Sequence, residues 1–156
     1  MLTYAQQSLN VKDNRPAVFL AGPSPRTQSI PSWRAEAVEY LKDHYDIFIP
    51  EFEDGHVPEG EFDHSAQIEW EQNAMVYADI ILFWIPRNDS TMLGLTTNDE
   101  FGYWRASKPS KLVLGVPEGS FRTRYQLYWA NKLDIPTANT LKEACDIVIS
   151  KMYKVD

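Results

Sequence analysis

Residues 79–85 read DIILFWI, and residues 94–103 read GLTTNDEFGY. The first stretch is a short apolar run that predicts a buried β-strand, and the second opens a helix that we expect over residues 96–107. One polar loop separates them. This order places Glu100 in the first turn of a helix beyond the carboxyl end of a strand, where open α/β sheets bind their ligands.

The carboxylate of Glu100 has two interpretations. It can act as a nucleophile, because Asp and Glu side chains form covalent intermediates in several classes of enzyme. It can also cap its own helix, since Thr97 followed by Glu100 fits a capping box, as does Thr96 followed by Asp99. The remaining motifs of the chain favour the nucleophile.

The rest of the chain alternates between strand and helix patterns. Strands are predicted at residues 17–21, 46–49, 79–85 and 111–116, with a short strand near 133–135, and helices at 33–45, 64–78, 96–107, 121–132 and 139–153. This alternation predicts an α/β fold, a doubly wound parallel sheet of about five strands of the Rossmann or flavodoxin type. We expect residues 1–16 to form a loose N-terminal arm and residues 17–156 to form a single domain.

The composition limits the possible functions. The 156 residues are 44% hydrophobic and 24% charged, as in ordinary globular proteins, and the net charge of −7 argues against binding to nucleic acid or to an anionic membrane. The single cysteine, Cys145, excludes an internal disulfide and a cysteine-rich zinc site, and its apolar helical surroundings predict a core residue. No segment approaches the roughly 18 apolar residues of a membrane span, and residues 1–15 lack the apolar region of a signal peptide, so we expect a cytoplasmic protein.

Two further motifs fall near the same predicted sheet edge. Gly22-Pro23 follows the first predicted strand, where glycine permits a tight turn or a close approach of the backbone to a ligand. On the second predicted helix, Glu71 lies three residues after Ile68 and four before Met75, the spacing of the stripe that faces the sheet. A carboxylate on that stripe needs a partner or a place at a pocket rim, unless it lies at the edge of the stripe and reaches solvent.

Aromatic residues flank both carboxylates in the sequence. Trp70 precedes Glu71, and Trp104 follows Glu100 by four residues. Aromatic side chains can stack on a nucleobase, although most aromatic residues of a globular protein lie in its core.

Together these motifs resemble the nucleoside 2-deoxyribosyltransferase family, and in particular its branch of short 2-deoxyribosyltransferase-like proteins. The resemblance covers about residues 17–135. It is carried by FLAGP at 19–23, SWR at 32–34, WE at 70–71 with the strand that ends at Trp84, and EFGYW at 100–104. The last of these motifs is the most specific.

The resemblance implies a role for each matching residue. Glu100 is similar to the catalytic nucleophile of the family, and Glu71 to the acidic residue that meets the base. Substrate-binding positions are implied at Phe19, Gly22, Pro23, Trp70, Gly94, Tyr103 and Gln126. Gln126 would match the residue that a neighbouring subunit contributes to hold the sugar 5′-hydroxyl. The chain departs from the family at two positions, because many members carry Tyr in place of Phe19 and Asp in place of Gly94.

The activity implied by the resemblance is the transfer of 2-deoxyribose between nucleobases. The substrates would be 2′-deoxyribonucleosides and free nucleobases, and no metal ion or organic cofactor is expected. Two other functions stay open. One is an N-glycosidase that hydrolyses nucleoside 5′-monophosphates, with Ser120 and Arg122 on the phosphate; the other is a non-catalytic nucleotide-binding domain. The simpler interpretation of Ser120 and Arg122 is a helix cap followed by a solvated side chain.

The resemblance also implies a homo-oligomer, a dimer or an assembly of dimers. The expected interface consists of four residues early in the helix over 121–132, because mixed polar and aromatic surfaces suit interfaces: Tyr125, Gln126, Tyr128 and Trp129. The alternative is that Tyr125 and Trp129, four residues apart, pack on the sheet.

Overall fold

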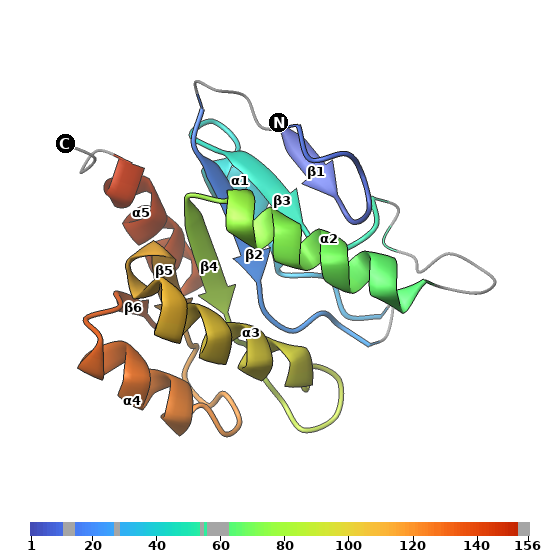
Figure 1. Ribbon diagram of the computed structural model, residues 1–156. Helices are drawn as coiled ribbons and strands as arrows, with labels where there is room; N and C mark the ends of the chain where they lie inside the picture. The colour runs from blue at the N-terminus through green and yellow to red at the C-terminus, as the bar shows by residue number, and fades with distance from the viewer. Residues whose placement is uncertain (11–14, 27–28, 54, 56–62, 153–156) are drawn as a thin grey trace.

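Six parallel strands form one sheet in the part of the chain that the structure describes (Figure 1). The structure is a computed structural model that describes residues 1–10, 15–26, 29–53, 55 and 63–152. The strands are β1 (Leu2–Tyr4), β2 (Ala17–Ala21), β3 (Asp46–Ile49), β4 (Ile80–Trp84), β5 (Leu112–Gly115) and β6 (Thr137–Ala138). Their order in the sheet is β1-β3-β2-β4-β5-β6, so the predicted doubly wound parallel sheet is confirmed.

Helices cover both faces of this sheet. In Figure 1, α2 (His64–Tyr77), α3 (Leu95–Ser107) and α4 (Arg124–Lys132) lie in front of the sheet, and α1 (Arg34–Leu41) and α5 (Leu141–Met152) lie behind it. A short 3₁₀ helix, η1 (Pro109–Lys111), leads into β5. The carboxyl ends of β2 and β4 point to the lower edge of the sheet in this view, and the loops that follow parallel strands meet at such an edge.

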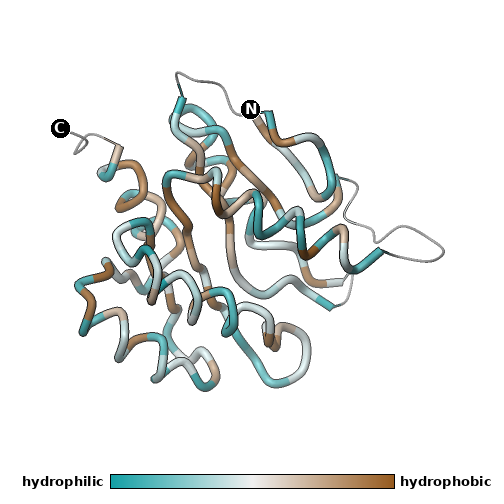
Figure 2. Tube along the Cα trace, in the orientation of Figure 1, coloured by the Kyte–Doolittle hydropathy of each residue, from teal (hydrophilic) through white to brown (hydrophobic). Residues whose placement is uncertain are grey.

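The apolar residues of the central strands alternate between two cores. From β2, Phe19 packs under α2 and α3, whereas Val18 and Leu20 pack under α1 and α5. Every residue of β2 and β4 is buried, and Figure 2 shows these strands in brown. Burial of one large apolar side chain contributes roughly 1.5–3 kcal/mol. Continuous apolar runs therefore specify the strands that are covered on both faces.

The path of the chain reverses at β2. From β2 it crosses to β3 on one side, and β4 then pairs with the other side of β2. The loops after β2 and β4 consequently lead to α1 and α3, on opposite faces of the sheet. Doubly wound sheets bind ligands at a switch point of this kind. The turn at Gly22 and the helix that carries Glu100 both begin there.

A sixth strand lies where the sequence predicts a loose arm. Leu2–Tyr4 pairs in parallel with β3, from Leu2 opposite Ile47 to Tyr4 opposite Ile49. The N-terminal ammonium also lies 2.5 Å from the buried carboxylate of Asp46. The loose-arm prediction is therefore wrong for residues 2–4, since so short a strand forms through pairing rather than through any pattern of its own. Residues 11–14 of the predicted arm lie outside the described residues.

The last strand lies later in the chain than predicted. Leu133 is the C-cap residue of α4, and Asp134 has a left-handed backbone with φ of 54°. The amide of Ile135 donates to the carbonyl of Ala130 at 2.9 Å, which closes the end of the helix. The apolar residues at 133–135 therefore cover the core from a helix terminus, and the strand is β6 at 137–138.

The predicted helices are present with shifted ends. α1 ends at Leu41 rather than at residue 45, and α4 begins at Arg124 rather than at residue 121. Thr123 is the N-cap residue of α4, so the predicted cap at Ser120 is wrong. Cys145, on α5, is buried in the core as expected. Over the described ranges, no helix is long and apolar enough to cross a membrane.

Candidate active site

Helix α3 begins at a glycine rather than at a side-chain cap. Its N-cap residue is Gly94, which has a left-handed backbone with φ of 60° and no side-chain cap hydrogen bond. Glu100 therefore lies in the second turn of α3, not in the first turn as the sequence predicts. The capping interpretation of Glu100 is wrong, because the helix starts earlier than a capping box at Thr96 or Thr97 requires.

The side chain of Glu100 lies in a site that disfavours its charge. Burial and the negative charge of Glu71 raise the pKa of Glu100 to about 8, with a smaller contribution from Asp99. The positive charge of Arg34 acts in the opposite direction and favours the ionised form. A carboxyl group with a pKa near neutrality can gain or lose a proton under physiological conditions, which is typical of catalytic carboxyl groups.

Glu71 approaches the same site from α2. Its Oε1 accepts a hydrogen bond from Gln67 Nε2 at 2.8 Å. Burial raises the pKa of Glu71, while the hydrogen bond from Gln67 and the charge of Arg34 lower it. The structure thus brings the two carboxyl groups of Glu71 and Glu100 within electrostatic reach of each other, from two different helices.

The predicted buried stripe of α2, through Ile68, Glu71 and Met75, is correct only in part. Ile68, expected on the buried stripe of α2, is 62% exposed. The buried stripe consists of Trp70, Ala74 and Met75. Glu71 lies at the edge of this stripe, where Gln67 and Arg34 are the partners that a partly buried carboxylate needs.

A buried arginine lies within electrostatic reach of the two carboxyl groups. Arg34 is the first residue of α1 and is only 2% exposed. Its Nε donates to the carbonyl of Leu20 at 3.0 Å, its Nη2 to the carbonyl of Gly22 at 2.6 Å, and its Nη1 to Ser24 Oγ at 3.0 Å and to the Glu51 carboxylate at 2.5 Å. All three nitrogens of the guanidinium group therefore donate to oxygens of the end of β2, of the turn after it or of the loop after β3.

The turn after β2 requires glycine at its first position. Gly22 has φ of 141°, and a Cβ there would lie 2.0 Å from the carbonyl oxygen of Trp84. The backbone of the turn thus touches the end of β4, which is the strand that leads to α3. Glycine at this position serves the close approach of two backbones.

Gly22→Ala is expected to destabilise the protein by about 2–4 kcal/mol, because the methyl group meets a backbone carbonyl and the φ angle disfavours L residues. Urea denaturation measures this loss. Gly102→Ala is the matched control: it lies within α3 and an added Cβ has no neighbour within 4 Å, so we expect a gain of about 0.5–1 kcal/mol. Equal stabilities of the two variants would contradict the close approach at Gly22.

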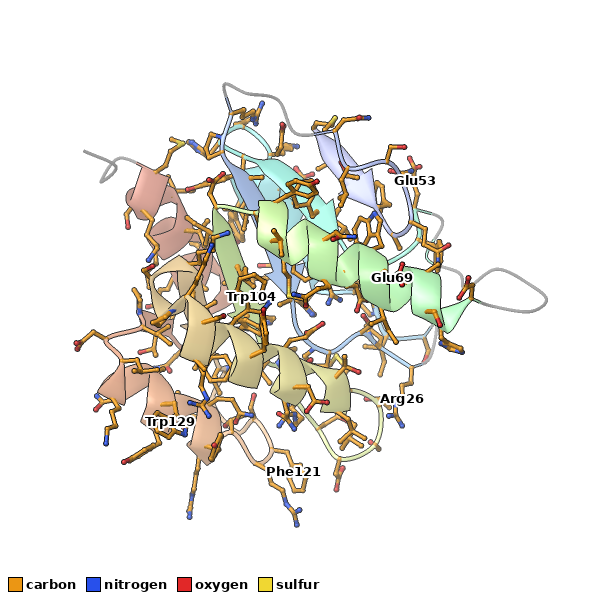
Figure 3. The ribbon with its side chains drawn as sticks, viewed as in Figure 1. Arg26, Glu53, Glu69, Trp104, Phe121 and Trp129 are labelled. Atoms are coloured by element: carbon orange, nitrogen blue, oxygen red, sulfur yellow. The ribbon has the colours of Figure 1, made fainter. Side chains whose placement is uncertain are left out.

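The turn after β2 also packs against the start of α3. A Cβ at Gly94 would lie 2.8 Å from Pro23 Cβ. The amide of Arg26 donates to the carbonyl of Thr91 at 3.0 Å, and Figure 3 shows Arg26 beside the loop between β4 and α3. Gly94 is therefore required by its backbone angle and by Pro23, and the Asp that the resembling proteins often carry at this position would not fit here without a shift of the turn.

The other predicted substrate-binding residues lie at different depths. Phe19 is fully buried in the core under α2 and α3. Trp70 is buried as well, and its Nε1 donates to the carbonyl of Gln7 at 2.7 Å. Tyr103 is exposed on α3 and packs edge-on against Trp104, with ring centroids 5.3 Å apart. Of these three side chains, Tyr103 offers its surface to a ligand.

Gln126 lies inside the subunit. It is 4% exposed, and its Nε2 donates to Asn98 Oδ1 at 2.7 Å. The same oxygen accepts a hydrogen bond from Arg87 Nη2 at 2.7 Å, and this nitrogen also donates to the carbonyl of Gly94 at 3.2 Å. This network joins α4, α3 and the loop after β4 within one chain. The side-chain amide of Gln126 is therefore engaged within its own subunit, and its contact with the pocket of a neighbouring subunit stays a prediction.

Sequence reasoning missed the two buried arginines as parts of the site. A signal for Arg34 is present, since it lies four residues before Val38 and seven before Leu41 on the buried stripe of α1. A charged residue on a buried stripe needs partners and therefore indicates a polar site. Arg87 has no comparable signal, because it lies in a loop whose path depends on the packing of Gly94.

Among the described residues, no three His, Cys, Asp or Glu side chains are grouped so that they could hold a metal ion.

A family model matches the part of the chain that carries this site. A comparison with curated proteins finds no match. The model of the family described as "Nucleoside 2-deoxyribosyltransferase like" matches residues 15–120, a segment that contains Gly22, Arg34, Glu71 and Glu100. Because this match spans well over half of the sequence, the chain belongs to the nucleoside 2-deoxyribosyltransferase-like family.

Proposed function

We propose that the protein is a nucleoside 2-deoxyribosyltransferase that exchanges nucleobases on 2′-deoxyribonucleosides through a covalent deoxyribosyl–Glu100 intermediate. The observation that carries this proposal is the pair of partly buried carboxyl groups, Glu71 and Glu100, beside the guanidinium of Arg34 at the switch point of the sheet. Retaining glycosidases use two carboxyl groups in this way, one as the nucleophile and one as the acid and base. Family membership supports the same chemistry.

In the first half of the reaction, the ionised carboxylate of Glu100 attacks C1′ of the deoxyribose. The bond from C1′ to the base nitrogen breaks, and its electron pair stays on the base. In the reactive form of the pair Glu100 is ionised and Glu71 is protonated, and Glu71 gives its proton to the departing base. The positive charge that develops on the sugar ring is stabilised by the carboxylate that attacks it.

In the second half, a nitrogen of another nucleobase attacks C1′ of the deoxyribosyl ester. The ester bond breaks, and Glu100 regains its negative charge. Glu71 takes the proton that the incoming base loses, so the site returns to its initial state. Two inversions at C1′ leave the configuration of the nucleoside unchanged. These steps use side chains alone.

Incubation of the pure protein with deoxyinosine and free adenine tests the proposal. We expect deoxyadenosine and hypoxanthine to accumulate together. Release of hypoxanthine without deoxyadenosine would indicate a hydrolase, and base release from nucleoside 5′-monophosphates alone would indicate the N-glycosidase. Binding without turnover would leave a nucleotide-binding domain. Each of these last three results would contradict the transferase.

We also propose that the protein forms a homo-oligomer through the layer of α2, α3 and α4. Apart from Leu2, the exposed large apolar side chains among the described residues lie on this layer or just before α4: Ile68, Val76, Tyr77, Leu95, Tyr103, Phe121, Tyr125, Leu127 and Tyr128. Trp129 packs partly on the core, and Arg105 lies over its ring at 4.3 Å; Figure 3 shows Trp129 on α4. Tyr125 is exposed rather than packed on the sheet. Exposed apolar surface of this kind marks interfaces.

Tyr128→Glu is expected to dissociate the assembly, because a buried carboxylate without a partner disfavours association by several kcal/mol at an interface. Sedimentation at micromolar concentration measures the change. Ser150→Glu is the matched control, since it adds the same charge to an exposed position of α5 on the opposite face of the sheet. A wild-type monomer with full activity would contradict the proposal, as would dissociation by the control variant.

A further inference from the structure

We propose that Arg34 is a positioning residue of this site: its guanidinium group holds the turn at residues 22–24 in place beside the two carboxyl groups, and its fixed positive charge favours the ionised nucleophile. The inference rests on the proposed function for its effect on the reaction. The effect of the Arg34 charge on the titration of Glu100 can be measured in the free protein, without any substrate.

Each nitrogen of the Arg34 guanidinium group has a hydrogen-bond acceptor. Its three nitrogens donate to oxygens that come from the end of β2, the turn after it and the loop after β3. Its plane also lies over the ring of Trp33, with 4.6 Å from Cζ to the ring centroid. A planar group with donors in a fixed fork suits this set of acceptors, and a lysine ammonium would reach fewer of them.

The turn that Arg34 holds packs against the end of β4 and the start of α3, the helix that carries Glu100. Gly22 touches the end of β4 through the Trp84 carbonyl, and Pro23 touches Gly94 at the start of α3. Arg34 donates two of the hydrogen bonds that tie this turn to the start of α1, to Gly22 and to Ser24, and Trp33 Nε1 donates a third to the Pro23 carbonyl at 3.1 Å. Loss of the two from Arg34 would loosen the turn and, with it, the packing of Pro23 on the start of α3.

The positive charge of Arg34 interacts with three carboxyl groups, those of Glu51, Glu71 and Glu100. Burial lowers the pKa of Arg34, and the charges of Glu51, Glu100 and Glu71 raise it again, with Glu51 in direct contact. Charges in a partly buried site are screened less than charges on the surface. A change at Arg34 or at its contact partner Glu51 should thus alter the proton affinity of Glu100 in opposite directions.

Three variants separate these effects. Arg34→Gln removes the charge, and Glu100 should then bind its proton about tenfold more tightly. Glu51→Gln leaves more of the arginine charge for the pair, so Glu100 should bind its proton several-fold less tightly. Arg34→Lys keeps the charge but loses part of the fork, so the titration should stay close to wild type while transfer slows at least about tenfold. Arg124→Gln, an exposed arginine on α4, is the control and should change neither quantity.

The experiment is the titration of side-chain carboxyl groups by ¹³C NMR in the free protein, followed by the pH–rate profile of base exchange. Opposite shifts for Arg34→Gln and Glu51→Gln support the inference, and identical titrations of both variants and wild type would overturn it. If Arg34→Gln does not fold, Glu51→Gln alone decides, since its titration should still move. Shifted titrations in a protein without base exchange would refute the proposed function and leave the charge role of Arg34 standing.

Discussion

Glu100→Gln is expected to lower the rate of base exchange by about 10³-fold or more, because the amide cannot form the glycosyl ester. The variant should fold, since no capping hydrogen bond depends on Glu100 and the helix begins at Gly94. Steady-state rates with deoxyinosine and adenine measure the loss. Asp99→Asn is the matched control, because it removes the neighbouring exposed carboxylate of α3 and should retain most of the activity. A Glu100→Gln variant with near-normal activity would remove Glu100 from the chemistry.

The same substitution should stabilise the protein at alkaline pH. The pKa of Glu100 is raised from 4.5 to about 8 by folding, so the folded protein holds a proton that the unfolded chain has already released. Stability is therefore lost as the pH rises through the window from 4.5 to about 8, and the penalty is complete above it. Above this window Glu100→Gln should be more stable than wild type by about 2–4 kcal/mol, and below it the two should be similar. Urea denaturation at both ends of the window measures the difference.

Glu71→Gln is expected to lower base exchange by about 10²-fold or more, because it removes the group that protonates the departing base. It should also move the pH–rate profile. In wild type the rate should first rise with pH, as Glu100 loses its proton, and then fall, as Glu71 loses the proton that it gives to the base. Since the charge of Glu71 helps to raise the pKa of Glu100, the rise should occur at lower pH in the variant.

The control for Glu71→Gln is Glu69→Gln, an exposed carboxylate on the same helix that Figure 3 shows on α2. It should keep both the rate and the profile of wild type. Identical rates and profiles for Glu71→Gln and wild type would remove Glu71 from the site. A lower rate with an unchanged profile would contradict the electrostatic contact between the two carboxyl groups.

Strong local patterns made the centre of the fold predictable. The apolar runs that became β2 and β4 are buried on both faces, so their sequence alone specifies them. The alternation of strands and helices predicts a parallel sheet whose connecting loops meet at one edge, and the structure has such a sheet. The edges of the sheet were harder to predict, since β1 depends on pairing with β3 and the place of β6 depends on the left-handed Asp134.

The side-chain environment of the site was predictable only in part. The resemblance assigns Gln126 to the sugar site of a neighbouring subunit, whereas the structure shows its amide buried against Asn98 where α4 packs on α3. The burial of Phe19 follows from its place on the central strand β2, whereas its implied contact with a substrate came from resemblance alone. Arg34 carries a readable signal in its helical spacing, but its partners at Gly22 and Ser24 are set by the path of the turn.

The central claim is that Glu100 becomes covalently bound to deoxyribose. Mass spectrometry of the protein, quenched in acid after incubation with deoxyinosine and no acceptor base, tests it most directly. We predict one added deoxyribosyl group on the peptide that contains Glu100, its disappearance when adenine is added, and its absence in Glu100→Gln. Base exchange by a protein that carries the deoxyribosyl group on another side chain, or base exchange by Glu100→Gln, would contradict the claim.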